Sequence, residues 1–99
     1  MFDLNLRDKV ILITGGSDGL GFSSAKLLSE QGAKIALCGR RGDYLKEKAD
    51  IIREETQNEV LDIQCDVTKA DECKNLVEQT ISHFKSIDVL VNNAGTSAA

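Results

Sequence analysis

The chain has 99 residues, enough for one small domain and too few for a second domain that would hold a substrate separately. With 41% hydrophobic and 28% charged residues, its composition is that of a folded globular protein and excludes a wholly disordered one. The net charge of -4, with no basic run longer than the arginine pair in GRRG, argues against nucleic-acid binding, which needs a basic face to displace counterions.

The three cysteines, Cys38, Cys65 and Cys73, are odd in number and form no CxxC pair. This pattern indicates neither a disulfide framework nor a zinc site, so we expect reduced, structural thiols. No apolar run approaches membrane-spanning length, and the first residues lack the basic region and apolar stretch of a signal peptide. These features predict a cytoplasmic protein without membrane contact.

The first apolar run, VILIT at residues 10–14, predicts a β-strand covered on both faces, because it is hydrophobic throughout and rich in β-branched residues. The glycine-rich stretch TGGSDGLG overlaps the end of this strand. A helix is then expected over residues 20–31, with Gly32 as its C-terminal cap. The apolar positions of this helix are Leu20, Ala25, Leu27 and Leu28.

The same alternation continues along the chain. Further strands are predicted at residues 34–39, 60–67 and 87–95, the last entering a glycine-containing turn. Amphipathic helices are expected over residues 44–56 and after a cap at Thr68. The apolar face of the second of these helices is Cys73, Leu76, Val77, Thr80, Ile81 and Phe84. The predicted order is β-α-β-α-β-α-β.

Strands that alternate with helices of this length predict an α/β fold with a doubly wound, Rossmann-like parallel sheet and right-handed crossovers. In such a sheet, ligands bind at the carboxyl ends of the strands, near the point where the strand order reverses. Here these ends carry TGGSDGLG, CGRRG, CDVT and NNAG. Four segments rich in glycine, charge or amides are therefore expected to meet at one edge of the sheet.

The glycine-rich stretch matches two known phosphate-binding loops only in part. Gly16 and Gly21 have the spacing of a Walker A loop, but Phe22 stands where a lysine must reach the phosphates. The GxGxxG fingerprint needs a third glycine after Gly19 and Gly21, and Ser24 occupies that place. These residues alone leave open whether the loop binds a phosphate or is merely flexible.

The stretch does match the pattern Thr-Gly-x-x-x-Gly-x-Gly and resembles the glycine motif of the short-chain dehydrogenase/reductase family, with Thr14, Gly15, Gly19 and Gly21 in the fixed places. NNAG resembles the second signature of this family, and CDVT resembles its adenine-contacting segment. The order and spacing of the three motifs agree, so the resemblance covers essentially the whole chain. It implies that residues 1–99 are the dinucleotide-binding portion, the N-terminal β-α-β-α-β-α-β half, of an NAD(P)(H)-dependent oxidoreductase.

The resemblance also implies how the cofactor is held. Gly15 would turn the chain off the strand, and Gly19 would bring backbone amides to the pyrophosphate at the helix N-terminus. Gly21 would let helix and strand pack closely. Asp66 would accept a hydrogen bond from the adenine amino group, with Val67 beside the ring.

The NNAG motif would contact the other half of the cofactor. Asn92 would lie near the ribose, and Ala94 and Gly95 would let the nicotinamide pass close to the backbone. The amides of Asn92 and Asn93 also fit a structural role, in which they tie neighbouring strands together. The complete set of predicted cofactor-binding residues is Gly15, Gly16, Ser17, Asp18, Gly19, Leu20, Gly21, Arg40, Arg41, Asp66, Val67, Asn92, Ala94 and Gly95; no metal ligand is predicted.

Charge at the end of the second strand favours NADP(H) over NAD(H). NAD-binding proteins carry an acid there that accepts hydrogen bonds from the ribose, whereas here Gly39 is followed by Arg40 and Arg41. Guanidinium groups are well shaped to bind a 2'-phosphate, and Ser17 is a candidate further donor. Asp18 opposes this assignment, because many NADP-preferring relatives carry Lys or Arg there. The two arginines also fit a solvated loop before a helix.

The catalytic residues of the family are a Tyr-x-x-x-Lys pair with a Ser and an Asn, all C-terminal to the NNAG strand. The chain ends four residues after Gly95, so the resemblance places catalysis in a half beyond these residues, and no catalytic residue is predicted here. Tyr44 and Lys48 have the catalytic spacing, but they precede NNAG and open a helix whose apolar stripe already explains its position. We therefore reject them as the catalytic pair.

Two functions remain. In the first, the parent protein transfers a hydride between NADP(H) and a small ketone or secondary alcohol and is a homo-oligomer at full length. In the second, the chain is a non-catalytic, truncated module that binds a nucleotide or a protein. Against the second function, the fourth strand would then be an apolar, unpaired edge that invites aggregation. The identity of the substrate and the direction of the reaction stay open.

Overall fold

The computed structural model describes residues 5–16 and 18–93, and the structural statements below refer to these residues. The elements follow the predicted order, although β3 and β4 are shorter than the predicted ranges 60–67 and 87–95. They are β1 (Val10–Thr14), α1 (Gly19–Glu30), β2 (Lys34–Gly39), α2 (Gly42–Thr56), β3 (Val60–Gln64), α3 (Ala70–Phe84) and β4 (Val89–Asn92).

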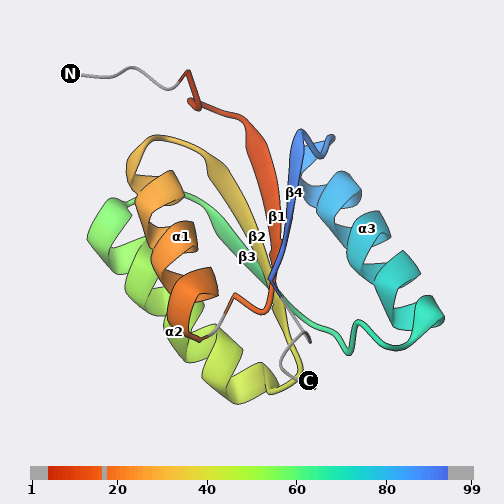
Figure 1. The fold of residues 1–99 in the computed structure, drawn as a ribbon. Helices are drawn as coiled ribbons and strands as arrows, with labels where there is room; N and C mark the ends of the chain where they lie inside the picture. Colours follow the sequence, from red (N-terminus) through yellow and green to blue (C-terminus); the bar gives the residue numbers. More distant parts are fainter. Residues whose placement is uncertain (1–4, 17, 94–99) are drawn as a thin grey trace.

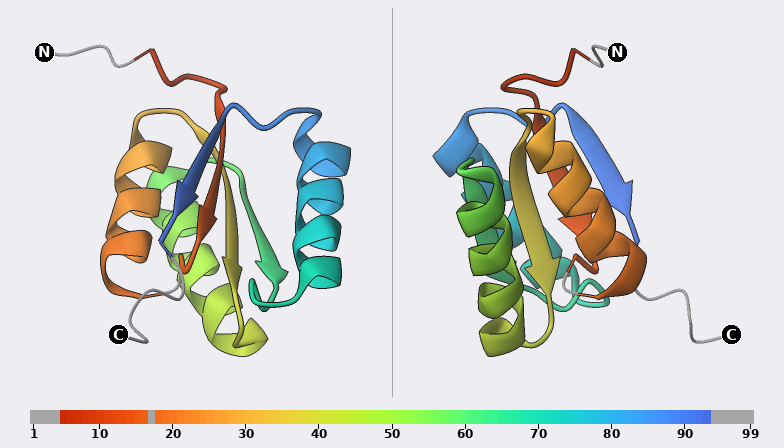
Figure 2. Two further views of the ribbon diagram at one scale, coloured as in Figure 1. Left: turned by 45° about the vertical axis from the view of Figure 1, so that its right-hand side comes forward. Right: turned by 90° about the vertical axis from the view of Figure 1, so that its left-hand side faces the viewer.

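The four strands are parallel and lie in the order β3-β2-β1-β4. Because β2 and β4 pair with opposite sides of β1, the strand order reverses between β1 and β4. Helices α1 and α2 cover one face of the sheet and α3 covers the other (Figure 1, Figure 2). The predicted doubly wound α/β architecture is therefore confirmed.

Each face of the sheet has its own hydrophobic core. Alternate residues of a strand point to opposite faces, so Ile11 and Ile13 of β1 pack toward α1 and α2, while Val10 and Leu12 pack toward α3. All four side chains are at most 2% exposed. This burial on both faces explains why β1 is hydrophobic at every position.

Helix α1 buries small residues and not the leucines that its sequence suggests. Leu20 and Leu27 are 72% and 57% exposed, whereas the buried positions of the helix are Gly21, Ala25 and Ser29. These small residues let α1 lie close to the sheet, and the two leucines project elsewhere. The predicted helix is present, but its apolar positions Leu20 and Leu27 do not mark its buried side.

Helix α3 differs from its prediction in two details. Val77 and Ile81 are 41% and 45% exposed, so the buried stripe is narrower than expected. Thr68 does not cap the helix: the N-cap residue is Lys69, without a side-chain cap bond, and the Thr68 hydroxyl donates to Asp66 instead. The buried residues of α3 are Leu76, Thr80 and Phe84.

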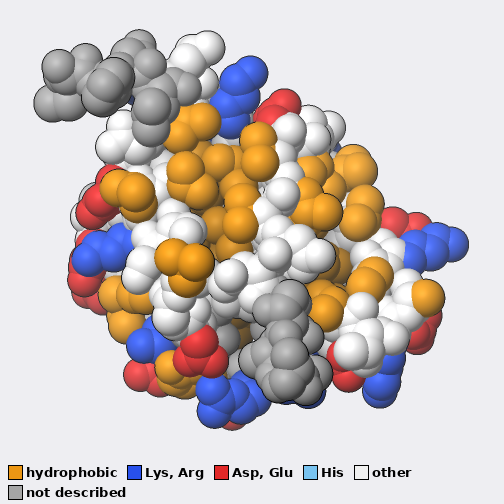
Figure 3. Space-filling view, viewed as in Figure 1, with side chains coloured by type: hydrophobic (Ala, Val, Ile, Leu, Met, Phe, Trp, Pro, Cys, Tyr) orange, Lys and Arg blue, Asp and Glu red, His pale blue; other side chains and the backbone are white. Residues whose placement is uncertain are grey.

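The β4 edge of the sheet is apolar and exposed. Val89 and Leu90 are 43% and 60% exposed, and hydrophobic side chains gather over β1 and β4 between α1 and α3 (Figure 3). Asp88 orders the start of this strand, because its carboxylate accepts a hydrogen bond from the Val10 N–H at 2.8 Å. Across residues 5–16 and 18–93, no helix combines the length and apolarity needed to cross a bilayer.

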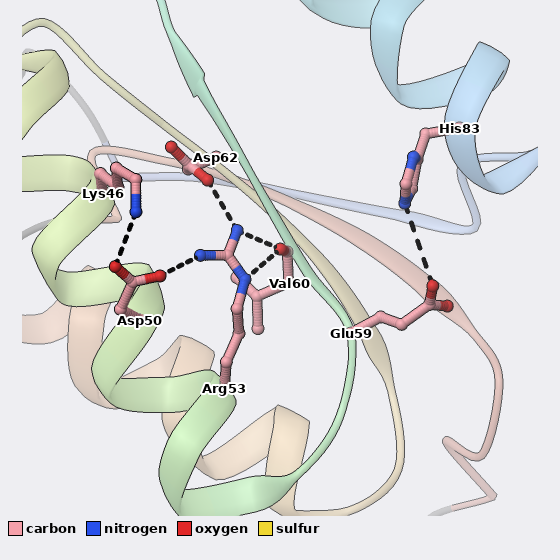
Figure 4. Close-up of polar contacts among 7 residues, drawn as sticks. All are labelled: Lys46, Asp50, Arg53, Glu59, Val60, Asp62 and His83. Atoms are coloured by element: carbon pink, nitrogen blue, oxygen red, sulfur yellow. Dashed lines mark hydrogen bonds and ion pairs between the residues drawn. The ribbon is translucent and has the colours of Figure 1, made fainter.

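A charged network joins α2 to the outer strand β3. The Arg53 guanidinium donates to the Val60 carbonyl oxygen at 2.8 Å through Nε, to Asp62 at 2.6 Å through Nη2 and to Asp50 at 2.5 Å through Nη1 (Figure 4). Lys46 donates to the second oxygen of Asp50 at 2.9 Å. The network lies toward the amino end of β3, away from the strand ends where ligands bind in this type of sheet.

Candidate cofactor site

The loop between β1 and α1 is shaped by close backbone contact. Gly15 has a φ of +66°, in the left-handed region that favours glycine. A Cβ on Gly21 would collide with the carbonyl oxygen of Gly15 and lie 2.7 Å from the Asn93 side-chain nitrogen. The first turn of α1 therefore packs directly on the loop, as the glycine spacing suggests.

This loop presents the N-terminus of α1 at the carboxyl edge of the sheet. The first N–H groups of a helix have no acceptor within the helix, and Asp18 at the N-cap makes no side-chain bond to them. Gly16 has a different place: it is buried, its N–H donates to the Cys38 carbonyl oxygen at 3.2 Å, and a Cβ there would lie 2.5 Å from Leu37. Gly16 thus anchors the loop on β2. Ser17 lies outside the described residues, and the Leu20 side chain is exposed.

The end of β2 brings Arg40 beside the end of β3. The Gln64 side chain donates to the Arg40 carbonyl oxygen at 2.9 Å, and the Cys65 N–H donates to the Gly39 carbonyl oxygen at 2.8 Å. Among the described residues, Arg40 forms no salt bridge. Arg40 lines a groove of about 500 Å³ together with Gln64, Asp66, Lys69, Glu72 and Asn75.

Arg41 is engaged differently from its neighbour. One of its terminal nitrogens lies 3.6 Å from an Asp18 carboxylate oxygen, and its guanidinium lies 4.3 Å from the centre of the Tyr44 ring. The Tyr44 hydroxyl donates to the other oxygen of Asp18 at 2.8 Å. Arg41 is therefore held against the glycine-rich loop, whereas Arg40 faces the groove.

Asp66 is fixed in a tight turn after β3. Its Oδ1 accepts hydrogen bonds from the Thr68 hydroxyl at 2.6 Å and the Thr68 N–H at 2.9 Å, and these bonds hold the pKa of the Asp66 carboxyl below its usual value. The Asp66 N–H donates to Glu72 at 2.8 Å. Val67 is half-buried against the core under α3. Asp66 thus offers an ionised carboxylate to a hydrogen-bond donor in the groove.

Thr14 ties the end of β1 to the end of β4. Its hydroxyl donates to the Asn92 side-chain oxygen at 2.9 Å and accepts a hydrogen bond from the Asn93 N–H at 2.9 Å. Asn92 is thus placed at the carboxyl edge beside the glycine-rich loop. Its bond to Thr14 also has a structural role, because it ties β4 to β1. Ala94 and Gly95 lie outside the described residues.

Tyr44 and Lys48 do not form a proton-transfer pair in this structure. The Tyr44 hydroxyl is bonded to Asp18, and the Lys48 ammonium lies 5.2 Å from the centre of the Tyr44 ring and 5.1 Å from that of Phe22. The contacts are cation–π in type. Their rejection as the catalytic pair stays a prediction from the sequence.

Two of the thiols, those of Cys38 and Cys65, are suited to packing and not to nucleophilic chemistry. Cys38 and Cys65 are buried, and burial raises the pKa of Cys65 to about 12. A thiol so far from ionisation is a poor nucleophile and metal ligand. In the part of the chain that the structure describes, no group of three or more His, Cys, Asp or Glu side chains could hold a metal ion.

Comparison with known proteins identifies the family of the chain. The family model for short chain dehydrogenase matches residues 9–99. The chain belongs to the short-chain dehydrogenase family. It is 45% identical over 95 residues to 11-beta-hydroxysteroid dehydrogenase 1A of Arabidopsis thaliana, covering 96% of this chain and 27% of that protein.

Solved structures of the family superpose closely. L-sorbose reductase from Gluconobacter frateurii, complexed with NADPH and L-sorbose, has a TM-score of 0.93 and 38% identity over 96% of this chain and 36% of the other. NAD+-bound xylitol dehydrogenase has a TM-score of 0.89 and 33% identity, covering 95% and 36%. The chain thus spans about a third of the length of these structures, and 27% of the first curated relative.

Two features of the site do not follow from the sequence analysis. Thr14 is identified there only as a motif position, although a threonine at a buried strand end is a signal for a hydrogen bond to the neighbouring strand. The contact of Asp18 with Tyr44 joins residues 26 positions apart, and no periodicity in the sequence points to it.

Proposed function

We propose that these residues form the NADP(H)-binding part of an oxidoreductase that transfers a hydride between the cofactor and a small ketone or secondary alcohol. The observation that carries the choice of cofactor is Arg40, which lines the groove at the carboxyl edge without a salt bridge among the described residues. A 2'-phosphate would supply a negatively charged partner for this guanidinium.

The described residues fit the rest of a dinucleotide. The N-terminus of α1 suits a pyrophosphate, because Gly19 and Gly21 have no side chain that would keep a ligand from the backbone amides. The ionised Asp66 suits the adenine amino group, with Val67 beside the ring, and Asn92 suits the ribose. When bound, the nicotinamide donates or accepts the hydride, and the residues named here bind and orient it.

The relatives support the reaction class and leave the cofactor to the residues. The solved structures include one reductase with NADPH and one dehydrogenase with NAD+, so membership of the family does not select between them. Gly39 stands where an acid would favour NAD(H), and Arg40 follows it. We therefore assign NADP(H) on charge.

Three further features of the function are proposed with it. Catalysis belongs to residues outside this chain, since the family pair of tyrosine and lysine follows the NNAG strand. The working protein is a homo-oligomer in the cytoplasm, the compartment that three unpaired cysteines favour. The alternative, a binding module without turnover, is favoured only by the absence of a catalytic pair from these residues.

Titration of the protein at its natural length with NADPH and with NADH tests the proposal. We expect NADPH to bind at least about tenfold more tightly, the effect of one charge-assisted hydrogen bond to the phosphate. Equal affinities would overturn the assignment of NADP(H), and the absence of binding to both would overturn the nucleotide site. Consumption of NADPH with simple ketones then separates an enzyme from a binding module.

A further inference from the structure

Asp18, Tyr44 and Arg41 form a cluster that joins the glycine-rich loop to the start of α2. The Tyr44 hydroxyl donates to Asp18 Oδ1 at 2.8 Å, and Asp18 Oδ2 lies 3.6 Å from Arg41 Nη2. The Arg41 guanidinium lies 4.3 Å from the centre of the Tyr44 ring. Each member of this Asp18–Tyr44–Arg41 cluster therefore contacts the other two.

The cluster changes what a phosphate would encounter at this corner of the site. Arg41 and Asp18 carry opposite charges, and at a separation of 3.6 Å their fields largely cancel a short distance away. Arg40, the adjacent residue, forms no salt bridge with the described residues, and the carboxylate of Asp66 in the same groove acts on it only at longer range. Two neighbouring arginines thus differ in how much positive charge they offer to a ligand.

The Tyr44 hydroxyl fixes the position of the Asp18 carboxylate. Asp18 is 65% exposed and would otherwise turn freely into solvent, but the phenol hydroxyl holds one of its oxygens and leaves the other toward Arg41. The ring also gives Arg41 a surface to stack on, which restricts the guanidinium to the same place. The Lys48 ammonium, 5.2 Å from the ring centre, is the other charge in contact with Tyr44.

We propose that Asp18 is a specificity-determining residue that weakens recognition of the 2'-phosphate by withholding Arg41, and that Tyr44 is the positioning residue that keeps Asp18 there. The inference rests on the proposed NADP(H) function. In this account Arg40 supplies most of the preference for NADPH, while Asp18 limits it. Removal of the Asp18 charge both frees Arg41 and ends the repulsion between a carboxylate and the phosphate.

The test is the ratio of NADPH to NADH affinity in Asp18→Asn, measured by calorimetric titration of the protein at its natural length. We expect the ratio to rise on the order of fivefold at low ionic strength and to fall back as salt is added, since both charges are exposed. Tyr44→Phe keeps the ring under Arg41 and removes the hydroxyl, and we expect a smaller rise. Glu47→Gln removes an exposed negative charge from α2 outside the cluster and should leave the ratio unchanged.

A double variant identifies Arg41 as the group released. Arg41→Ala in the wild-type background should lower the ratio slightly, whereas in the Asp18→Asn background it should remove most of the gain and leave only the part that comes from the lost repulsion between the carboxylate and the phosphate. An unchanged ratio in Asp18→Asn, with NADPH still preferred by the wild type, overturns the inference and leaves the proposed function intact. Equal changes for both nucleotides also overturn it. A wild type that binds neither nucleotide overturns the proposed function and the inference together.

Discussion

An arginine lies beside each end of β3, and the two arginines differ in how many bonds they make to the protein. At the amino end, Arg53 makes four hydrogen bonds, two to the Val60 carbonyl oxygen and one each to Asp50 and Asp62 (Figure 4). At the carboxyl end, Arg40 lines a groove with Asp66 and has no salt bridge among the described residues. Each arginine lines a surface groove, Arg53 at the amino end and Arg40 at the carboxyl end.

The difference separates structural charge from charge that a ligand can use. A guanidinium has five N–H donors, and Arg53 commits most of them to its own fold. These bonds cover the Val60 carbonyl on the outer strand, where an unpaired edge could recruit another chain. The Arg40 side chain forms no salt bridge with the described residues, so its donors are available to a ligand. The same residue type therefore stabilises the protein at one end and serves recognition at the other.

The largest expected effect comes from the glycine at the carboxyl end. In Gly21→Ala the new Cβ would collide with the Gly15 carbonyl oxygen, so backbone must shift. We expect a loss of about 3 kcal/mol or more in the free energy of unfolding, measured by urea denaturation. If Gly21→Ala were as stable as the wild type, the carboxyl end would not be preorganised for a ligand. The contrast between the two ends of β3 would then be wrong.

Gly19→Ala is the matched control. Gly19 has a φ of +48°, but among the described residues outside its own turn of helix no atom lies within 4 Å of the place that an alanine methyl group would take, so only backbone strain of about 1 kcal/mol is expected. Equal losses for the two alanine variants would contradict the role of close packing at Gly21.

Arg53→Ala tests the amino end directly. The change leaves the Asp50 and Asp62 carboxylates without the guanidinium and uncovers the Val60 carbonyl oxygen, so we expect a loss of about 1–3 kcal/mol in stability. The affinity for NADPH under native conditions should not change. A fall in that affinity without a fall in stability would mean that the two ends are not separate in function.

Thr14→Val sharpens the comparison at the carboxyl end. The valine keeps the shape but removes the hydroxyl that bonds Asn92 and the Asn93 N–H, so we expect a loss of about 1–2 kcal/mol in thermal or urea unfolding. Thr14→Ser retains the hydroxyl and should lose less. The reverse order would show that the methyl group, and not the bond between β1 and β4, stabilises this end.

The smallest effect is a dependence of stability on pH at both ends. The Lys46 and Arg53 partners of Asp50 lower the pKa of that carboxyl, and the Thr68 bonds lower the pKa of Asp66, each from a usual value of 3.8. Since both folded pKa values are depressed, the stabilisation is present above about pH 3.8 and is lost as the pH falls through the folded values. Urea midpoints between pH 6 and pH 2, taken roughly one unit apart, should fall less in Asp50→Asn and Asp66→Asn than in the wild type. Parallel curves would contradict the assignment.

Much of the fold follows from periodicity and glycine placement. The hydrophobic run of β1 identifies a strand buried on both faces, and the three motifs at the strand ends predict the edge at which we propose that the cofactor binds. Which side of α1 is buried did not follow, because helix position is set by the close approach at Gly21 and not by the most hydrophobic residues. Leu20 and Leu27 are exposed for that reason.

The site was predictable as a set of segments but not as a set of contacts. The motifs brought Arg40, Arg41 and Asp18 to one edge, yet the sequence could not show that Arg41 is paired with Asp18 while Arg40 is not. That distinction depends on side-chain geometry between the glycine-rich loop and α2 that no local pattern encodes. The assignment of all these residues to cofactor binding stays a prediction, and Ser17, Ala94 and Gly95 also lie outside the described residues.

The most direct test of the central claim is the affinity of Arg40→Ala for NADPH and NADH, with its unfolding free energy measured on the same sample. We expect NADPH to weaken by about ten- to a hundredfold while NADH changes little, because only NADPH has the 2'-phosphate. Stability should stay within about 0.5 kcal/mol of the wild type. Equal weakening of both nucleotides, or a loss of stability like that of Arg53→Ala, would contradict the account of Arg40 as the residue kept free for the phosphate.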